Sequence, residues 1–142
     1  MKITIGLNIN YSGYNNLGFV KTLDPFVINA ECTEILALGI INYIEVEKIP
    51  AFLQHVVSKM RHGGKLTLTG KDIFHFAKLV MTQPGNIGLV EVNQMIYGPA
   101  NQRPYASQVH VNYIADILQQ LGLKIDRKSL DDGDFIIEAT RP

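Results

Sequence analysis

Residues 41–69 read INYIEVEKIPAFLQHVVSKMRHGGKLTLT, and this stretch decides the fold that the sequence predicts. Its middle has the spacing of a helix with one apolar face, because hydrophobic residues recur three or four positions apart. Pro50 is tolerated in the first turn, and Arg61 and His62 suit the last turn. Gly63-Gly64 then predicts the end of the helix. The apolar positions are Ile49, Phe52, Leu53, Val56, Val57 and Met60.

Strands flank this helix on both sides. The segment from Lys65 to Thr69 alternates polar and apolar residues, as a strand does. The run from Cys32 to Ile41 is largely apolar, which predicts a strand buried on both faces. A strand, a helix and a second strand at this spacing form a βαβ unit, which requires parallel pairing and a right-handed crossover. The stretch therefore predicts an α/β fold with a parallel sheet.

The remaining elements extend this unit along the chain. Asp72 can cap a helix that begins at Ile73, and Asp131-Asp132-Gly133 predicts a β-hairpin. This order predicts a single domain over residues 1–142, with a mostly parallel sheet, an antiparallel C-terminal hairpin and minimal helical layers. The expected strands are Lys2–Ile5, Asn16–Val20, Leu123–Ser129 and Asp134–Ala139, and the expected helices are Ile73–Met81, Leu89–Tyr97 and Val111–Leu121.

The composition argues against several classes of protein. The 142 residues are 46% hydrophobic, enough for a sizeable core, and 13 basic residues balance 13 acidic ones. Because Lys and Arg are scattered, we expect no nucleic-acid binding. Cys32 is the single cysteine and cannot form an intramolecular disulfide, and no apolar run approaches the length of a membrane span. We therefore expect a cytoplasmic protein without a signal peptide.

Four stretches give the chain a resemblance to a known family. MKITIG at 1–6 followed by YSGYNN at 11–16 is similar to the family's opening strand and loop. INYI at 41–44 stands where the family usually has Leu-Glu-His-Ile, and MRHGGKL at 60–66 is similar to Leu-Lys-Pro-Gly-Gly-Lys-Leu. The end of the chain, from His110 to Pro142, is similar to the family's closing helix, Gly-Phe turn and last strand. Together they resemble the class I S-adenosylmethionine-dependent methyltransferases, in particular a compact subgroup with little of the early helical layer.

The resemblance implies a Rossmann-like sheet that binds S-adenosylmethionine at its strand ends. The family's first loop is rich in glycine, but here only Gly6 remains. Gly18 stands at the position of the acid that binds the ribose hydroxyls, and Asn42-Tyr43 replaces a Glu-His pair. The cofactor motifs are thus degraded while the packing motifs remain. The cofactor-binding residues that the resemblance implies are Gly6, Leu7, Asn8, Asn42 and Tyr43, with Gly18 marking the lost ribose contact.

The chemistry of the residues leaves several interpretations open. Gly6 suits either a cofactor loop or an ordinary turn after a strand. Asn42, Tyr43 and Glu45 follow a central strand, so they either line a pocket at the edge of the sheet or only cap the next helix. The loop Gly98–Ser107 is expected to form a lid or a binding wall, or else a partner contact or a plain surface connection. The substrate-side candidates are Tyr97, Arg103, Tyr105 and His110, and no His or Cys spacing indicates a metal.

Two functions of different classes follow from this sequence. The first is an S-adenosylmethionine-dependent methyltransferase of unknown acceptor, since methyl transfer can need little more than positioning. The alternative is a catalytically inactive methyltransferase-like module that binds a small molecule or an unknown protein, because a fold does not imply its family's chemistry. Asn8, Asn10 and Asn42 also leave open a different nucleotide-like ligand. The apolar, uncharged character of the chain is compatible with a homo-oligomer.

Overall fold

A computed structural model describes residues 1–7, 9–19, 22–83, 85–100 and 104–142. Two short 3₁₀ turns, η1 (Ile41–Tyr43) and η2 (Val46–Lys48), follow the third strand. The strands are β1 (Lys2–Ile5), β2 (Asn15–Asn16), β3 (Cys32–Leu38), β4 (Met60–Lys71), β5 (Lys124–Asp131) and β6 (Asp134–Thr140). The α-helices are α1 (Ile49–Lys59), α2 (Ile73–Thr82), α3 (Leu89–Tyr97) and α4 (Val111–Gln120).

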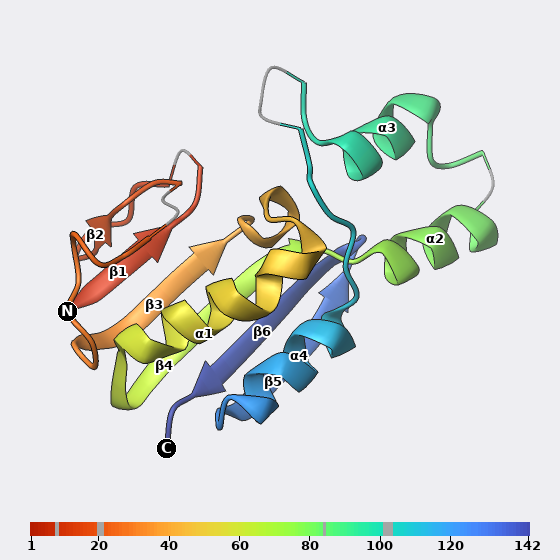
Figure 1. The fold of residues 1–142 in the computed structure, drawn as a ribbon. Helices are drawn as coiled ribbons and strands as arrows, with labels where there is room; N and C mark the ends of the chain where they lie inside the picture. The colour runs from red at the N-terminus through yellow and green to blue at the C-terminus, as the bar shows by residue number, and fades with distance from the viewer. Residues whose placement is uncertain (8, 20–21, 84, 101–103) are drawn as a thin grey trace.

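The strands of the described residues form one sheet in the order β2-β1-β3-β4-β6-β5 (Figure 1). β2, β1, β3 and β4 are parallel to one another. β6 pairs antiparallel with β4, and β5 pairs antiparallel with β6 to complete the hairpin. The structure therefore confirms the predicted βαβ unit and the mostly parallel Rossmann-like sheet with its antiparallel C-terminal hairpin.

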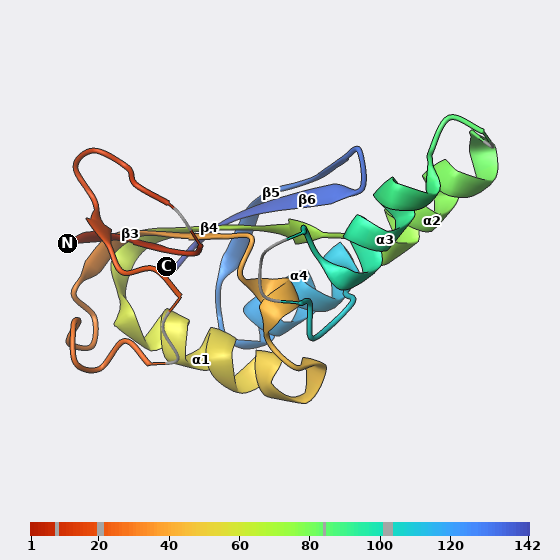
Figure 2. The ribbon, with the colours of Figure 1, turned by 90° about the horizontal axis from the view of Figure 1, so that it is seen from above.

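The two helices that pack on the sheet, α1 and α4, cover the same face (Figure 2). Side chains of β3, β4 and β6 meet the apolar sides of these helices in a continuous core. Burial of this apolar surface is the main force that holds α1 and α4 on the sheet. Members of this core with no exposed surface include Ile35, Leu66, Ile137, Leu53, Val56, Ile114 and Leu118.

The opposite face of the sheet carries no helix among the described residues (Figure 2). Its charged side chains pair across neighbouring strands, with 3.5 Å between Lys2 Nζ and Glu34 Oε2 and 3.5 Å between Arg127 Nη1 and Glu138 Oε1. Alternation along β4 places Lys65, Thr67, Thr69 and Lys71 on this face and Leu66 and Leu68 in the core, whereas β3 places Leu36 and Leu38 on the open face. The open face is therefore suited to water, as antiparallel sheets often are and parallel sheets seldom are.

The prediction for β3 needs two corrections. The strand ends at Leu38 rather than at Ile41, because Gly39 turns the chain and Ile41 begins a 3₁₀ turn. The expectation of burial on both faces is also wrong, since alternate residues such as Leu36 are only half-buried. A continuous hydrophobic segment is typical of a strand buried on both faces. It does not reveal that one face of this sheet lacks a covering helical layer.

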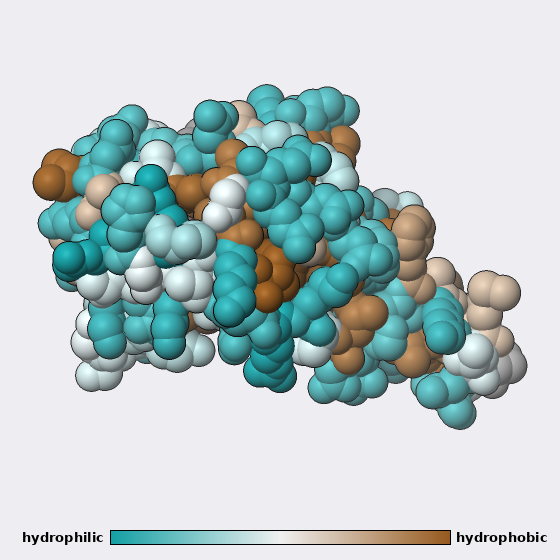
Figure 3. All heavy atoms as spheres, turned by 90° about the horizontal axis from the view of Figure 1, so that it is seen from below, coloured by the Kyte–Doolittle hydropathy of each residue, from teal (hydrophilic) through white to brown (hydrophobic). Residues whose placement is uncertain are grey.

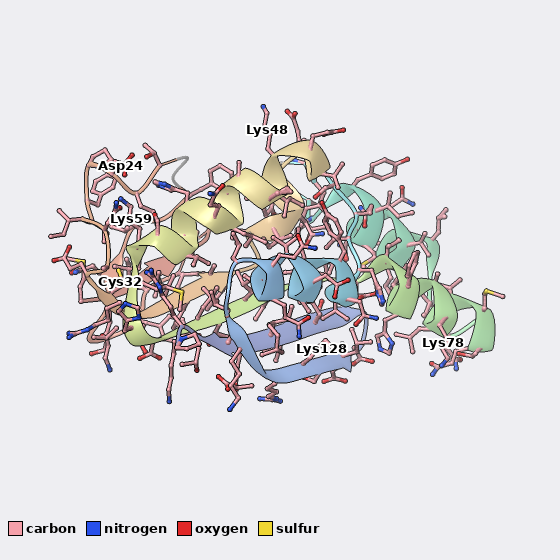
Figure 4. All side chains as sticks on the ribbon, turned by 60° about the horizontal axis from the view of Figure 1, so that its bottom comes forward. Asp24, Cys32, Lys48, Lys59, Lys78 and Lys128 are labelled. Carbon is pink, nitrogen blue, oxygen red and sulfur yellow. The ribbon has the colours of Figure 1, made fainter. Side chains whose placement is uncertain are left out.

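The prediction for the end of α1 is wrong as well. The helix ends at Lys59, whose Nζ donates hydrogen bonds to Asp24 Oδ1 at 2.6 Å and Asn29 Oδ1 at 2.9 Å (Figure 4). Met60 is already extended and fully buried, and it pairs with Cys32 at the start of β4. Arg61, His62 and Gly63-Gly64 therefore belong to the strand. These residues form an irregularity in the pairing of β3 with β4. After the pair Cys32–Met60 the next pair is Glu34–Lys65, so one residue of β3 stands opposite four residues of β4.

Other boundaries agree more closely. Asp72 caps α2, as predicted, and its carboxylate accepts a hydrogen bond from His75 N. The prediction for α3 is confirmed at both ends, and the prediction for α4 differs by one residue at its C-terminal end. β2 is shorter than the expected segment from Asn16 to Val20, and Val20 lies outside the described residues.

Helices α2 and α3 form an arm that stands away from the sheet (Figures 1 and 2). α2 contains no buried residue, and in α3 only Met95 is buried. The chain enters and leaves the arm at one place, because Ile73 N donates to Val109 O at 3.0 Å and Asp72 forms an isolated parallel bridge with Val109. The arm therefore extends from the carboxyl end of β4.

Candidate functional site

The carboxyl ends of β1, β3 and β4 lie at one edge of the sheet, where open α/β sheets bind their ligands. Gly39 N donates to the backbone oxygen of Thr69 at 3.1 Å and to its Oγ1 at 3.0 Å, which ties the ends of β3 and β4 together. The residues that follow these strands form the walls of the candidate site.

Gly6, the first of the predicted cofactor residues, is held by the chain's own contacts. Its N–H donates to Gly18 O at 3.1 Å, so these two predicted residues do lie together. A Cβ at Gly6 would lie 2.5 Å from Leu38 O and 2.3 Å from Ile9 Cδ1, which only glycine avoids. The side chain of Ile9 therefore covers Gly6. Leu7 is half-buried, and Asn8 lies outside the described residues.

Asn42 is buried and has a structural role at this edge. Its Oδ1 accepts from Lys71 N at 2.8 Å, and its Nδ2 donates to Ser107 O at 3.3 Å. Its backbone oxygen also accepts from Ala106 N at 2.7 Å and Ser107 N at 3.1 Å. Asn42 therefore fixes the segment that leads to α4 against the end of β4, which sequence reasoning did not anticipate.

Three aromatic rings form a row along the strand ends. The rings of Phe19 and Tyr43 meet edge to face with centroids 6.1 Å apart, and those of Tyr43 and Tyr105 do so at 5.1 Å. Edge-to-face pairs of this kind hold rings in fixed orientations. The row, which we call the aromatic row, therefore connects segments that follow β2, follow β3 and precede α4.

Tyr105 is the polar member of the aromatic row nearest the C-terminal hairpin. Burial, together with the neighbouring Tyr43 and Asp134, raises the pKa of Tyr105 to about 12. Its phenol is therefore neutral at physiological pH and keeps a proton that can be donated in a hydrogen bond.

Members of the aromatic row line two pockets, with Tyr105 in the wall of one and Phe19 and Tyr43 in the wall of the other. The hairpin pocket has a volume of about 320 Å³ and reaches from Asn42 and Tyr105 to the β5–β6 hairpin. The helix pocket has a volume of about 460 Å³ and lies between the end of β3 and α1. Residues that line the hairpin pocket include Gly70, Lys71, Ser129, Asp131 and Asp134, and those that line the helix pocket include Phe19, Tyr43, Glu45, Lys48, Phe52 and His55.

The two pockets differ in their charges. In the hairpin pocket Lys71 Nζ lies 2.6 Å from Asp134 Oδ1, and Asp131 adds a second carboxylate. In the helix pocket Glu45 and Lys48 form an exposed pair at 3.4 Å beside aromatic walls. The prediction that Asn42, Tyr43 and Glu45 lie on a pocket wall agrees with their positions, although Asn42 faces one pocket and the other two face the second.

His110 lies apart from both pockets. Its Nδ1 is 2.9 Å from Asp72 Oδ2, which also accepts from Val111 N at 2.7 Å. Its ring also lies against Phe74, with centroids 4.8 Å apart. The carboxylate of Asp72 thus caps α4 as well as α2 and orients the imidazole. A capping motif at the start of α2 gave no sign of this second contact across the fold.

The substrate-side candidates are therefore only partly brought together. Tyr105 lines the hairpin pocket, and its N–H donates to Tyr97 O at 3.0 Å, whereas the Tyr97 side chain is 65% exposed on the arm. Arg103 lies outside the described residues. Sequence reasoning missed Phe19, Lys71 and Asp134. The facing positions of Lys71 and Asp134 depend on the register of β4 and β6, which the sequence does not specify.

Neither a metal-binding cluster nor a membrane-spanning helix is found among the described residues. No group of three or more His, Cys, Asp or Glu side chains among them could hold a metal ion. Likewise, none of the helices in the described ranges is long and apolar enough to cross a membrane.

The structure is similar to several solved methyltransferases. One is an S-adenosylmethionine-dependent methyltransferase from Mesorhizobium loti, with a TM-score of 0.60 and 12% identity over 94% of this chain and 72% of that one. Another, from Archaeoglobus fulgidus, has a TM-score of 0.58 and 12% identity over 96% and 75%. A third is magnesium protoporphyrin IX methyltransferase from Synechocystis with bound SAH, with a TM-score of 0.56 and 17% identity over 92% and 53%.

These similarities concern the fold alone. The chain spans only about half of the Synechocystis enzyme, 53% of its length. The sequence matches no family model and no curated protein. The molecule has the class I S-adenosylmethionine-dependent methyltransferase-like fold, as the resemblance predicted.

Proposed function

We propose that this protein is an S-adenosylmethionine-dependent methyltransferase whose donor occupies the helix pocket and whose acceptor occupies the hairpin pocket. The aromatic row carries this proposal, because Tyr43 lines the helix pocket, Tyr105 lines the hairpin pocket, and the centroids of these two rings are only 5.1 Å apart at the ligand-binding edge of a methyltransferase-like sheet. A transfer between two bound molecules needs two neighbouring sites in fixed orientation.

The residues of the helix pocket fit an adenosyl group. Phe19, Tyr43 and Phe52 offer aromatic surface for a flat base, and Glu45 offers a carboxylate for ribose hydroxyls. Its volume of about 460 Å³ lies within the range of about 300–1,000 Å³ that ligand pockets usually have. Glu45 would replace the acid that is absent at Gly18. Because Ile9 covers Gly6, we place the donor against Tyr43 rather than over the first loop.

The chain's own residues would bind and orient the reactants. S-adenosylmethionine, when bound, supplies an electrophilic methyl group on a sulfonium. Tyr105 keeps its proton, so its phenol can donate a hydrogen bond to the acceptor. Asp131 and the Lys71–Asp134 pair can fix polar groups of the acceptor in the hairpin pocket. Catalysis would then rest on proximity and orientation rather than on a charged nucleophile of the protein.

The alternative is a module of the same fold that binds a ligand or partner without catalysis. Two observations favour it: Ile9 fills the space over Gly6, and all the polar atoms of the Asn42 side chain are used within the protein. In this interpretation the strand ends are stabilised by internal contacts that replace those to a cofactor.

Isothermal titration calorimetry with S-adenosylmethionine and S-adenosylhomocysteine distinguishes the two functions. We expect micromolar binding that Glu45→Gln weakens by about 10-fold to 100-fold, the effect of losing hydrogen bonds to a charged group. Glu47→Gln is the matched control, because Glu47 is exposed nearby and is not part of the helix pocket. An absence of heat with both compounds would refute the methyltransferase and leave the binding module.

A further inference from the structure

The arm, which α2 and α3 form, exposes several large apolar side chains to water. Phe74 is 64% exposed and Met81 is 81% exposed on α2, and they lie seven residues apart, on one side of the helix. On α3, Leu89 and Ile96 share one side and Val90 and Tyr97 share another by the same spacing. Leu89 is 78% and Val90 70% exposed. Figure 3 shows brown and tan side chains along the arm on the face that it displays.

The arm has too little packing of its own to account for its helices. α2 has 10 residues and α3 has 9, whereas isolated helices shorter than about 12–15 residues are marginal in water. In proteins, short helices are stabilised by burying an apolar side. Only Met95 is buried in either helix, and Ile73, Phe76, Leu79 and Val80 of α2 are half-buried, so the described residues of the chain supply only part of that burial.

The exposed area suits a stable protein interface. A fully exposed aromatic residue presents roughly 150–250 Å² and an aliphatic one somewhat less, so the six residues, at their exposed fractions of 37% to 81%, present on the order of 700 Å². A standard protein–protein interface buries about 800 Å² on each partner. These residues are Phe74, Met81, Leu89, Val90, Ile96 and Tyr97.

The charges of the arm indicate which partner fits. Between Ile73 and Ala100 the sequence has one lysine, Lys78, and one glutamate, Glu91. A lipid surface or a nucleic acid would call for a face rich in Lys and Arg. A second copy of the same arm is also neutral and equally apolar, so two arms can meet without net repulsion. Lys78 lies near the outer part of the arm (Figure 4).

We propose that the arm is the dimerisation element of this protein, and that α2 and α3 of two copies pack together as an intermolecular four-helix bundle. The pairing is two-fold symmetric, so the same exposed residues face each other in both copies. Apolar residues on more than one side of α3 suit such a bundle, because each helix then contacts two neighbours. The interface is independent of the strand-end pockets.

Sedimentation velocity and light scattering on the full chain test this proposal. We expect a dimer whose dissociation constant rises by about 30-fold or more in Val90→Asp, because a carboxylate would be buried in an apolar interface. Ile28→Asp is the matched control, since Ile28 is 72% exposed and lies outside the arm. It should leave the dimer intact. Helix content measured by circular dichroism should also fall on dilution below the dissociation constant, because the separated arms lose their packing.

Three results would overturn the proposal. One is that the protein stays monomeric at the highest soluble concentration. This holds even if the arm of that monomer binds an unrelated protein. Another is a dimer that Val90→Asp leaves unchanged, which would place the interface elsewhere. The third is a dimer whose helix content does not change when it dissociates.

Discussion

Asp72 connects three elements through one buried carboxylate. Its Oδ1 accepts from His75 N at 2.9 Å, and its Oδ2 accepts from Val111 N at 2.7 Å and lies 2.9 Å from His110 Nδ1. Two helix N-termini and an imidazole therefore share a single carboxylate.

Asp72→Asn should destabilise the protein by about 2–3 kcal/mol, because an amide has one acceptor oxygen and cannot serve both helices. Urea denaturation gives this free energy of unfolding. Asp132→Asn is the matched control, since Asp132 is exposed in the hairpin turn and its change should stay within about 0.5 kcal/mol. Equal stability of the two variants would show that the carboxylate does not join the helices.

Tyr105 should ionise only at a pH well above the ordinary value for tyrosine. Its pKa is raised from 10.0 to about 12, so the folded state holds the proton more tightly than the unfolded state does. The stability that this residue contributes is therefore present below pH 10.0 and is lost as the pH rises to about 12. Absorbance titrations of the wild type and Tyr105→Phe should differ only near pH 12. A difference at lower pH would contradict the burial of this phenol.

The Lys59–Asp24 pair predicts a loss of stability in acid. Lys59 has a side chain only 3% exposed, and its hydrogen bond lowers the pKa of Asp24 below the ordinary 3.8. A lowered pKa contributes stability above 3.8 that is lost as the pH falls through the folded value. In urea denaturation, wild type should therefore exceed Asp24→Asn in stability at neutral pH. The two should converge in strong acid, and a constant difference would exclude the ion pair as its cause.

At the scale of helices and strands, the sequence predicted correctly those features that depend on contacts between neighbouring residues. The cap at Asp72, the spacing of α4 and the hairpin turn are decided by neighbouring residues, and the sequence located all three. The end of α1 is decided by Lys59, which meets Asp24 and Asn29 from a distant loop, and by Met60, which pairs with Cys32. Those contacts are not visible in a helical pattern, so Gly63-Gly64 looked like the stop.

The end of β4 requires glycine at position 70. A Cβ there would lie 2.8 Å from Phe135 Cε1 and 3.1 Å from Asn42 Oδ1, and the Phe135 ring is fully buried. Gly70→Ala should therefore cost about 1–3 kcal/mol in thermal or urea unfolding, the usual cost of overpacking. Gly88→Ala is the comparison, because its nearest neighbour would be 3.9 Å away. A harmless Gly70→Ala would mean that Phe135 moves freely.

At the scale of the whole molecule, the central strands should be the most stable part. β3 and β4 are each paired on both sides and lie under the packed helices, whereas β2 has two residues at an edge. Native-state hydrogen exchange should show β3 and β4 amides exchanging only through global unfolding, and those near β2 exchanging earlier. Equal protection of β2 would contradict this order.

The candidate site shows where sequence reasoning ends. Tyr43 and Glu45 could be placed on a pocket wall because the ends of parallel strands meet at one edge. The role of Asn42 could not be foreseen, since its partners Lys71 and Ser107 are 29 and 65 residues away in the sequence. Phe19 joins the aromatic row only because the chain after β2 returns to the end of β3. These contacts depend on which distant segments the fold brings together, and local sequence patterns do not specify that.

The bridge between Asp72 and Val109 gives the arm the character of an insertion. The chain leaves the sheet at Asp72 and returns beside it at Val109, so the order of the strands does not depend on the helices between these two residues. Descendants of this protein can lengthen, shorten or exchange the inserted helices while inheriting the same core. The dimer contact that we propose for the arm can therefore change in evolution while the scaffold that carries it stays the same.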